Sequence, residues 1–169
     1  MDCRLSVAGS GQEQTDCNAS ANNRQSTTDN PVTAAWGFPM SVGILLLTHE
    51  AMGAALIATA KHILGRVPLA LAACAIPPGS DIDAALRDAA ARVRELDSGD
   101  GVLVLTDIYG ATPSNIAQQL PALGLDVQRV SGLNLPMLLR VLNYAEQPLL
   151  ELAQTAASGG RSGILVDHA

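Results

Sequence analysis

Four short, continuous apolar runs alternate with stretches of helical spacing, and this alternation restricts the fold more than any other feature of the sequence. The runs are Val42–Leu47, Leu69–Ala75, Val102–Thr106 and Val127–Val130. A strand that is apolar on both sides is typical of a parallel sheet covered on both faces. Parallel neighbours are joined by right-handed helical crossovers, so the pattern predicts an open, doubly wound, mainly parallel α/β sheet with helices on both faces. The common strand order 2-1-3-4 is expected.

The helices between these runs are predicted from their spacing and their end signals. The first extends to about Leu64, with an apolar side formed by Met52, Leu56, Thr59 and Ile63. The second begins at a capping box of Ser80 and Asp83. A hydroxyl followed by proline, Thr112-Pro113, predicts the start of a short third helix, with Thr112 at the cap.

Two further helices complete the predicted chain. Asn134 is expected to cap the fourth helix, and Pro148 opens the fifth, which is predicted to end near Gly159-Gly160. Ser162–Val166 then reads as a final short strand, which would form an antiparallel C-terminal edge of the sheet.

Residues 1–40 differ sharply in composition from the rest of the 169-residue chain. They are rich in Ser, Asn, Gln, Thr and Gly and lack apolar periodicity. Such a segment buries too little apolar surface to offset its ordering entropy. We therefore expect a disordered N-terminal extension over 1–40, with a translation start at Met40 as a further hypothesis, and a folded domain over 41–169.

Charge and cysteine content narrow the class of protein. The formal net charge is -6, whereas a nucleic-acid binder needs a basic surface. No apolar run approaches the roughly 20 residues of a membrane span, so direct membrane insertion is not expected. The chain has three cysteines, Cys3, Cys17 and Cys74, which match neither a disulfide framework nor a metal site. A reducing cytoplasm is the expected location.

The strand order places two ionisable residues in one crevice. Ligands of open parallel sheets bind beyond the carboxyl ends of the strands, where the order reverses. In the order 2-1-3-4 the switch point lies between strands 1 and 3, which are followed by His49 and Asp107. His49 also stands at a helix N-terminus, which favours an anion, and a carboxylate on one ring nitrogen leaves the other free to attack. A second helix N-terminus, Gly110–Ser114, would approach from strand 3.

A simpler interpretation remains open at this point, in which His49 is only a strand-end residue and Asp107 only a loop cap. Of the other histidines, His62 is expected to be structural and His168 to be mobile. The chain has no HExxH, GxSxG, Walker A or GxGxxG motif and no Cys/His metal spacing. Metal hydrolysis, serine chemistry and dinucleotide binding therefore lack support.

Three segments of the sequence match a known family. "VGILLLTHEAMGAALIATAKHILG", "GDGVLVLTDIYGATPSNIA" and "VSGLNLPMLLRVL" together resemble the mannose-family enzyme IIA of the bacterial phosphoenolpyruvate-dependent sugar phosphotransferase system. The resemblance covers about residues 41–166. It implies that His49 accepts a phosphoryl group from the carrier HPr and passes it to an enzyme IIB, while Asp107 orients the imidazole.

The resemblance also implies roles for the surrounding residues. The phosphoryl oxygens would be bound by the turn residues Gly110, Ala111, Thr112 and Ser114, whereas Thr48 and Asn134 would shape the pocket. A homodimer is implied, in which Ser162–Val166 adds to the partner's sheet, and no metal or organic cofactor. Two positions depart from the family pattern, because Glu50 and Ala111 stand where glycine is common. We expect Glu50 to face solvent or the donor protein, and Ala111 to avoid a positive φ.

Two other functions compete with the phosphoryl-carrier prediction. A regulatory phosphorelay protein would use the phosphorylation state of His49 to control a partner without sugar transport. A flavodoxin-like binder would hold a small ligand at the same switch point without covalent chemistry.

Overall fold

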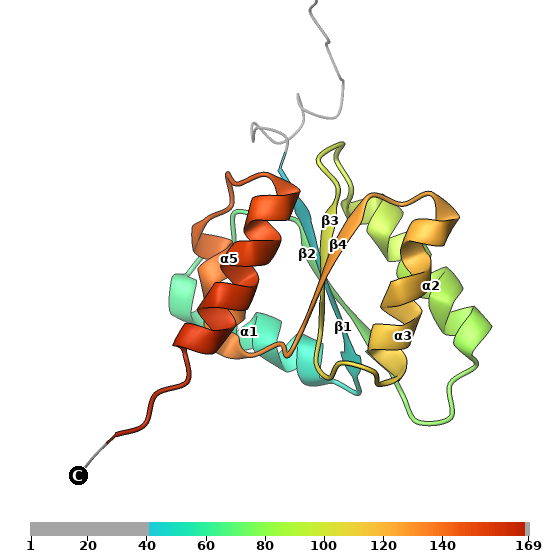
Figure 1. The fold of residues 1–169 in the computed structure, drawn as a ribbon, viewed down its shortest axis with the longest axis horizontal. Helices are drawn as coiled ribbons and strands as arrows, with labels where there is room; N and C mark the ends of the chain where they lie inside the picture. Colours follow the sequence, from blue (N-terminus) through green and yellow to red (C-terminus); the bar gives the residue numbers. More distant parts are fainter. Residues whose placement is uncertain (1–40, 168–169) are drawn as a thin grey trace, which may run out of the picture.

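A four-stranded parallel sheet lies at the centre of the computed structural model, which describes residues 41–167 (Figure 1). The strands are β1 (Gly43–His49), β2 (Leu71–Ile76), β3 (Val102–Thr106) and β4 (Val127–Ser131). Their order is β2-β1-β3-β4, so the predicted order 2-1-3-4 is confirmed. The expected disorder of residues 1–40 and the mobility expected of His168 lie outside the described residues.

Helices cover both faces of this sheet. They are α1 (Met52–Leu64), α2 (Ile82–Leu96), α3 (Thr112–Gln119), α4 (Leu135–Asn143) and α5 (Leu149–Ser162), with a 3₁₀ turn, η1, at Leu120–Leu123. Figure 1 shows α1 and α5 on one side of the sheet and α2 and α3 on the other. Helix α4 packs against α5 and α1. The doubly wound arrangement follows from right-handed crossovers between parallel strands.

The residues of β1 alternate between two hydrophobic cores. Ile44 and Leu46 pack with α4 and α5, whereas Leu45 and Leu47 pack with α2 and α3. All four side chains are fully buried. Strand β1 is thus buried on both faces, as its unbroken apolar run predicts.

Three local predictions differ from the structure. Asp81, not Ser80, caps α2, because its carboxylate accepts the backbone N–H of Asp83 at 3.1 Å. Ala111 occupies the cap position of α3, so Thr112 is the first helical residue. The buried side of α1 contains Gly53 and Ala60, with Leu56, Ile57 and Leu64 packed beside them, whereas Met52 and Ile63 are exposed.

The predicted final strand is wrong for the described chain. Helix α5 continues through the two glycines to Ser162, and residues 163–167 form no strand there. Ile164, Leu165 and Val166 are instead largely exposed. Within residues 41–167, no helix has the length and hydropathy needed to cross a membrane.

Candidate functional site

His49 and Asp107 lie in direct contact at the carboxyl edge of the sheet. His49 is the last residue of β1, and Asp107 follows the last residue of β3. These strands are neighbours, with Leu47 opposite Thr106, so both side chains leave the same edge. Nδ1 of His49 lies 2.8 Å from Oδ2 of Asp107. The structure therefore brings together the two residues that the strand order predicts to share a crevice.

Three polar contacts hold the Asp107 carboxylate. Its Oδ2 also accepts the backbone N–H of His49 at 2.8 Å, and its Oδ1 accepts the backbone N–H of Ile108 at 2.8 Å. Burial raises the pKa of the carboxyl, but the hydrogen bonds from the backbone and ring of His49 and from Ile108 outweigh it, so the pKa of Asp107 lies below its usual value. Asp107 is therefore ionised at neutral pH.

An ionised carboxylate fixes the tautomer of the neutral imidazole. Oδ2 can only accept a hydrogen bond, so Nδ1 of His49 carries the proton and donates it. The lone pair then resides on Nε2. The side chain of His49 is 40% exposed, whereas that of Asp107 is 5% exposed. The arrangement presents a nucleophilic nitrogen from a ring that is anchored on its inner side and accessible to solvent.

The turn after His49 connects β1 to α1 through one strained residue. Glu50 has a φ of 47°, a left-handed value that glycine adopts more readily, and its side chain is exposed, as expected. Thr48 is fully buried, and its hydroxyl accepts the backbone N–H of Gly53 at 2.9 Å. Thr48 thus supports the N-terminus of α1, and it does not line the cavity beside His49.

A cavity of about 430 Å³ opens beside His49. Part of its lining comes from the loop between β2 and α2, which contributes Pro77 to Ser80, together with the flanking residues Ile76 of β2 and Ile82 of α2. Thr112 of α3 also lines the cavity. This loop was missed as part of the site in the sequence analysis. The order 2-1-3-4 also makes β2 a neighbour of β1, so the residues that follow β2 leave the sheet beside His49. Pro77-Pro78-Gly79 could therefore have been predicted to border the site, although the sequence pattern was interpreted only as the end of a strand.

The four residues predicted to bind the phosphoryl oxygens occupy different surroundings. Thr112 shares the cavity with His49. Gly110 has a φ of 80° in the exposed turn before α3, and Ala111 has a φ of -81°, so Ala111 avoids a positive φ as expected. Ser114 is buried and lines a separate cavity that also contains Arg129 and Ser131.

Asn134 serves the packing of two helices. Its Oδ1 accepts the backbone N–H of Met137 at 2.9 Å, which confirms the predicted cap of α4. Its Nδ2 donates to the carbonyl of Gly160 in α5 at 3.2 Å. The side chain therefore joins α4 to α5, and Asn134 is absent from the lining of the cavity at His49.

A comparison with protein families decides the class of the chain. Residues 43–157 match the family model EIIA-man, described as the PTS system fructose IIA component. The chain belongs to the mannose-type EIIA family of the phosphotransferase system. The resemblance drawn from the three sequence segments is thereby confirmed.

Curated relatives of this mannose-type EIIA chain are longer than the chain itself. The PTS system mannose-specific EIIAB component of Escherichia coli K12 is 28% identical over 127 residues, and the component of that name from Shigella flexneri matches to the same extent. The match covers 74% of this chain but 39% of either relative. The chain thus spans well under half the length of these relatives.

Solved structures share the fold of the mannose-type EIIA chain. The mannose/sorbose-specific IIA subunit from Enterococcus faecalis superposes with a TM-score of 0.69 and 25% identity, covering 77% of this chain and 97% of that subunit. The EIIA component from Streptococcus agalactiae gives a TM-score of 0.64 at 20% identity, covering 74% of this chain and 96% of that one. The second likeness concerns the fold alone.

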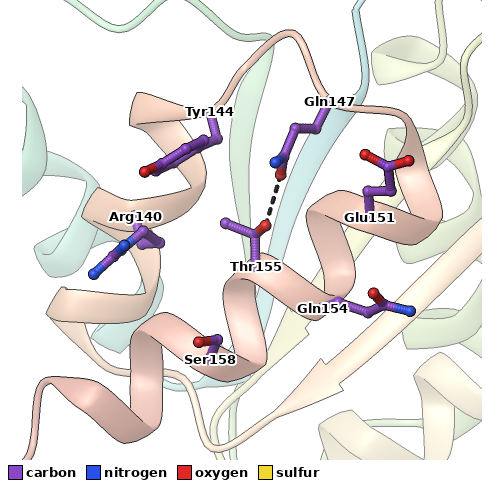
Figure 2. A pocket seen from close by; sticks show the side chains of 7 residues that line it. All are labelled: Arg140, Tyr144, Gln147, Glu151, Gln154, Thr155 and Ser158. Atoms are coloured by element: carbon purple, nitrogen blue, oxygen red, sulfur yellow. Dashed lines mark hydrogen bonds between the residues drawn. The ribbon is translucent and has the colours of Figure 1, made fainter.

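A further cavity of about 560 Å³ lies between α4 and α5 of this EIIA domain, away from the predicted site (Figure 2). Gln147 and Thr155 are joined across it by a hydrogen bond of 2.6 Å. Arg140 lies 5.9 Å from the ring centroid of Tyr144. None of the predicted site residues lines this cavity. Within residues 41–167, no group of three or more His, Cys, Asp or Glu is arranged to bind a metal ion.

Proposed function

We propose that this mannose-type EIIA protein is a phosphoryl carrier of a bacterial sugar phosphotransferase system. His49 accepts a phosphoryl group from phospho-HPr and passes it to an enzyme IIB. The observation that supports this role is the contact between the exposed His49 ring and the buried, ionised Asp107. A histidine held this way has one nitrogen committed to orientation and the other free for nucleophilic attack.

The transfer step exchanges one phosphorus–nitrogen bond for another. The lone pair of Nε2 of His49 attacks the phosphorus of phospho-HPr, and the bond from phosphorus to the HPr histidine breaks. The departing histidine nitrogen keeps the electron pair, so the phosphoryl group moves without any oxidation or reduction. Asp107 stabilises the positive charge that develops on the His49 ring as the new bond forms.

The phosphoryl oxygens are bound from the N-terminus of α3. Phosphoryl transfer through a loose transition state depends on positioning and charge stabilisation more than on covalent activation. The Thr112 hydroxyl, which shares the cavity with His49, donates to the group, and the turn Gly110–Ser114 supplies backbone N–H groups. Pro113 has no N–H, so it cannot contribute a backbone donor.

Exposed apolar side chains at the carboxyl edge of the sheet suit a protein as the exchange partner. Four such residues are Met52, Ile82, Ile108 and Tyr109, which are 40%, 43%, 61% and 79% exposed. Met52 and Ile82 begin α1 and α2, and Ile108 and Tyr109 lie between β3 and α3. Exposed apolar patches commonly mark surfaces that bind other proteins. A small-ligand site would instead enclose its apolar groups. Both HPr and enzyme IIB would dock here in turn, in the cytoplasm.

A homodimer is part of the same proposal. The unpaired segment after α5 carries Ile164, Leu165 and Val166, which are 74%, 82% and 76% exposed. Strand β4 is an edge strand, so its outer backbone groups are available to a further strand. The C-terminal segment of one protomer would pair with the edge of its partner's sheet.

The decisive experiment is phosphoryl labelling. Incubation with labelled phosphoenolpyruvate, enzyme I and HPr should place an acid-labile, base-stable label on the protein. His49→Ala should abolish the label, whereas His62→Ala should retain it, because His62 is an exposed residue in the last turn of α1. A label that persists in His49→Ala would contradict the proposal.

A second stage separates transport from regulation. Addition of a mannose-family enzyme IIB should remove the label from wild-type protein and transfer it to the IIB histidine. A label that stays on His49 would favour the regulatory phosphorelay over the carrier function.

A further inference from the structure

Glu50 places a negative charge next to the proposed phosphoryl acceptor, and it does so in a backbone conformation that is unfavourable for residues other than glycine. It is the sole non-glycine residue with a positive φ in the described range 41–167. A left-handed conformation costs a non-glycine residue on the order of 1 kcal/mol. Glutamate lacks the short side chain that lets asparagine or aspartate stabilise such a turn locally. Residues kept in such conformations concentrate at functional sites.

The lysine and arginine side chains of residues 41–167 lie outside the cavity beside His49, and Arg129 lines the separate cavity that contains Ser114. On α1 the basic residues are Lys61 and His62 in the last turn, so Lys61 lies roughly 14 Å along the helix axis from the first residue. Within residues 41–167, the Glu50 carboxylate forms no ion pair. The charged side chains adjoining His49 are thus two carboxylates, those of Glu50 and Asp107.

Phosphorylation of His49 would add about two negative charges between these carboxylates. Neighbouring Cα atoms lie about 3.8 Å apart, and the extended side chains of His49 and Glu50 add at most roughly 10 Å, so the Glu50 charge lies within roughly 14 Å of the phosphoryl group. Like charges at that separation repel even in solvent, which raises the free energy of the phosphorylated form relative to the free form. The N-terminus of α1 attracts the phosphoryl group and so lessens this repulsion, but it does so equally whether glutamate or glutamine occupies position 50.

We propose that Glu50 sets the phosphoryl-transfer potential of His49, by repelling the bound phosphoryl group so that it is held weakly and passed on readily. This inference rests on the proposed carrier function and extends it to a residue outside the reacting pair. Glu50 acts through charge and takes no part in the bond exchange. The phosphoryl group exchanges between the HPr histidine nitrogen and Nε2 of His49, and Glu50 shifts the position of this equilibrium.

The test measures the equilibrium constant for exchange between phospho-HPr and His49. Labelled phospho-HPr and the full chain are mixed, and both labelled proteins are quantified after exchange is complete. At about 10 mM salt, Glu50→Gln should shift the equilibrium toward phospho-His49 by about two- to threefold. At about 1 M salt, where the Debye length is about 3 Å, the shift should shrink to less than about 1.2-fold.

The control is Glu95→Gln, which removes an exposed carboxylate from the last turn of α2, at the opposite edge of the sheet. It changes the net charge equally and should leave the equilibrium unchanged. Because an equilibrium constant depends only on the free end states, a Glu50 role confined to docking would change the rates alone and would overturn the proposal.

Three results separate this inference from the function on which it rests. Absence of any label on wild-type protein would overturn the carrier function and the role of Glu50 together. Normal labelling of wild type with an unchanged equilibrium in Glu50→Gln would overturn the role of Glu50 alone. A lower melting temperature in Glu50→Gln with an unchanged equilibrium would assign Glu50 to helix stabilisation instead, and would also overturn it.

Discussion

The Oδ2 atom of Asp107 accepts two hydrogen bonds from His49, one from Nδ1 of the ring and one from the backbone N–H, each at 2.8 Å. The two bonds fix the ring relative to its own backbone. The remaining oxygen of Asp107 accepts the N–H of Ile108, so the carboxylate is itself held in place. One buried side chain thereby determines both the direction of the ring and the nitrogen that carries the proton.

Replacement of Asp107 by asparagine should slow phosphorylation of His49 by about 10- to 1,000-fold. The amide has no negative charge to stabilise the developing imidazolium, and its NH₂ group can favour the wrong tautomer. The rate of label transfer from phospho-HPr measures the effect. A folded variant that is labelled at the wild-type rate would exclude the orienting role of Asp107.

The stability that Asp107 contributes should depend on pH with a defined sign. Its folded pKa lies below the unfolded value of about 3.9, so its contribution is fully present above that value. The contribution is lost as the pH falls through the folded pKa. Urea unfolding between about pH 5 and pH 2.5 should therefore show the advantage of wild type over Asp107→Asn shrinking toward low pH. Asp88 also has a lowered pKa, but it is present in both proteins and cancels in the difference.

The pairing of His49 with Asp107 was predictable from the sequence because it follows from topology. Buried runs at Val42–Leu47 and Val102–Thr106 identify two parallel strands, and in the order 2-1-3-4 they are neighbours. Residues that follow neighbouring parallel strands leave the same edge. No side-chain geometry is needed for that inference, whereas the 2.8 Å contact required the structure.

The face that α1 buries was not predictable from hydrophobicity alone. The apolar pattern of the sequence predicts that Met52 and Ile63 are buried against the sheet. The structure instead places Gly53 and Ala60 there. A Cβ at Gly53 would lie 3.1 Å from the Thr48 hydroxyl and 3.2 Å from the Leu46 Cβ. The helix approaches so closely that only a small residue fits there. Close packing is a property of two surfaces, and a one-dimensional pattern does not contain it.

The end of α5 was misjudged for a similar reason. Gly159-Gly160 resembles a helix terminator, but both glycines pack against α4 inside the helix. A Cβ at Gly159 would lie 2.6 Å from the Arg140 Cβ, and one at Gly160 would lie 2.7 Å from the Met137 Cε. Tertiary packing of α4 against α5 therefore overrides the weak helix propensity of glycine.

Removal of the residues after Gly163 should convert the proposed dimer to a monomer. The three exposed apolar residues of that segment would pair with a partner's sheet edge, and the truncation removes them. Sedimentation equilibrium of the full chain and the truncated chain measures the change. A full chain that sediments as a monomer at micromolar concentration would contradict the dimer, as would an unchanged dimer after truncation.

Replacement of Glu50 by glycine should stabilise the fold by about 1 kcal/mol, because glycine adopts the φ of 47° without steric cost. The gain appears as a higher midpoint in urea unfolding. Glu50→Ala is the matched control, since alanine removes the charge but keeps the Cβ and should gain far less. Equal stability of the alanine and glycine variants would show that charge, and not backbone strain, sets the effect.

Replacement of Thr48 by valine should destabilise the fold by about 1–3 kcal/mol. Valine has nearly the same shape but removes the hydroxyl that accepts the Gly53 N–H at 2.9 Å, and this fully buried position leaves the donor without a substitute. Thr106→Val is the matched control. The Thr106 hydroxyl pairs at 2.7 Å with that of Ser131, which is only partly buried and lines an open cavity, so water can replace the lost partner. Urea unfolding should therefore show a clearly larger loss for Thr48→Val, and equal losses would remove the assigned role of Thr48 in supporting α1.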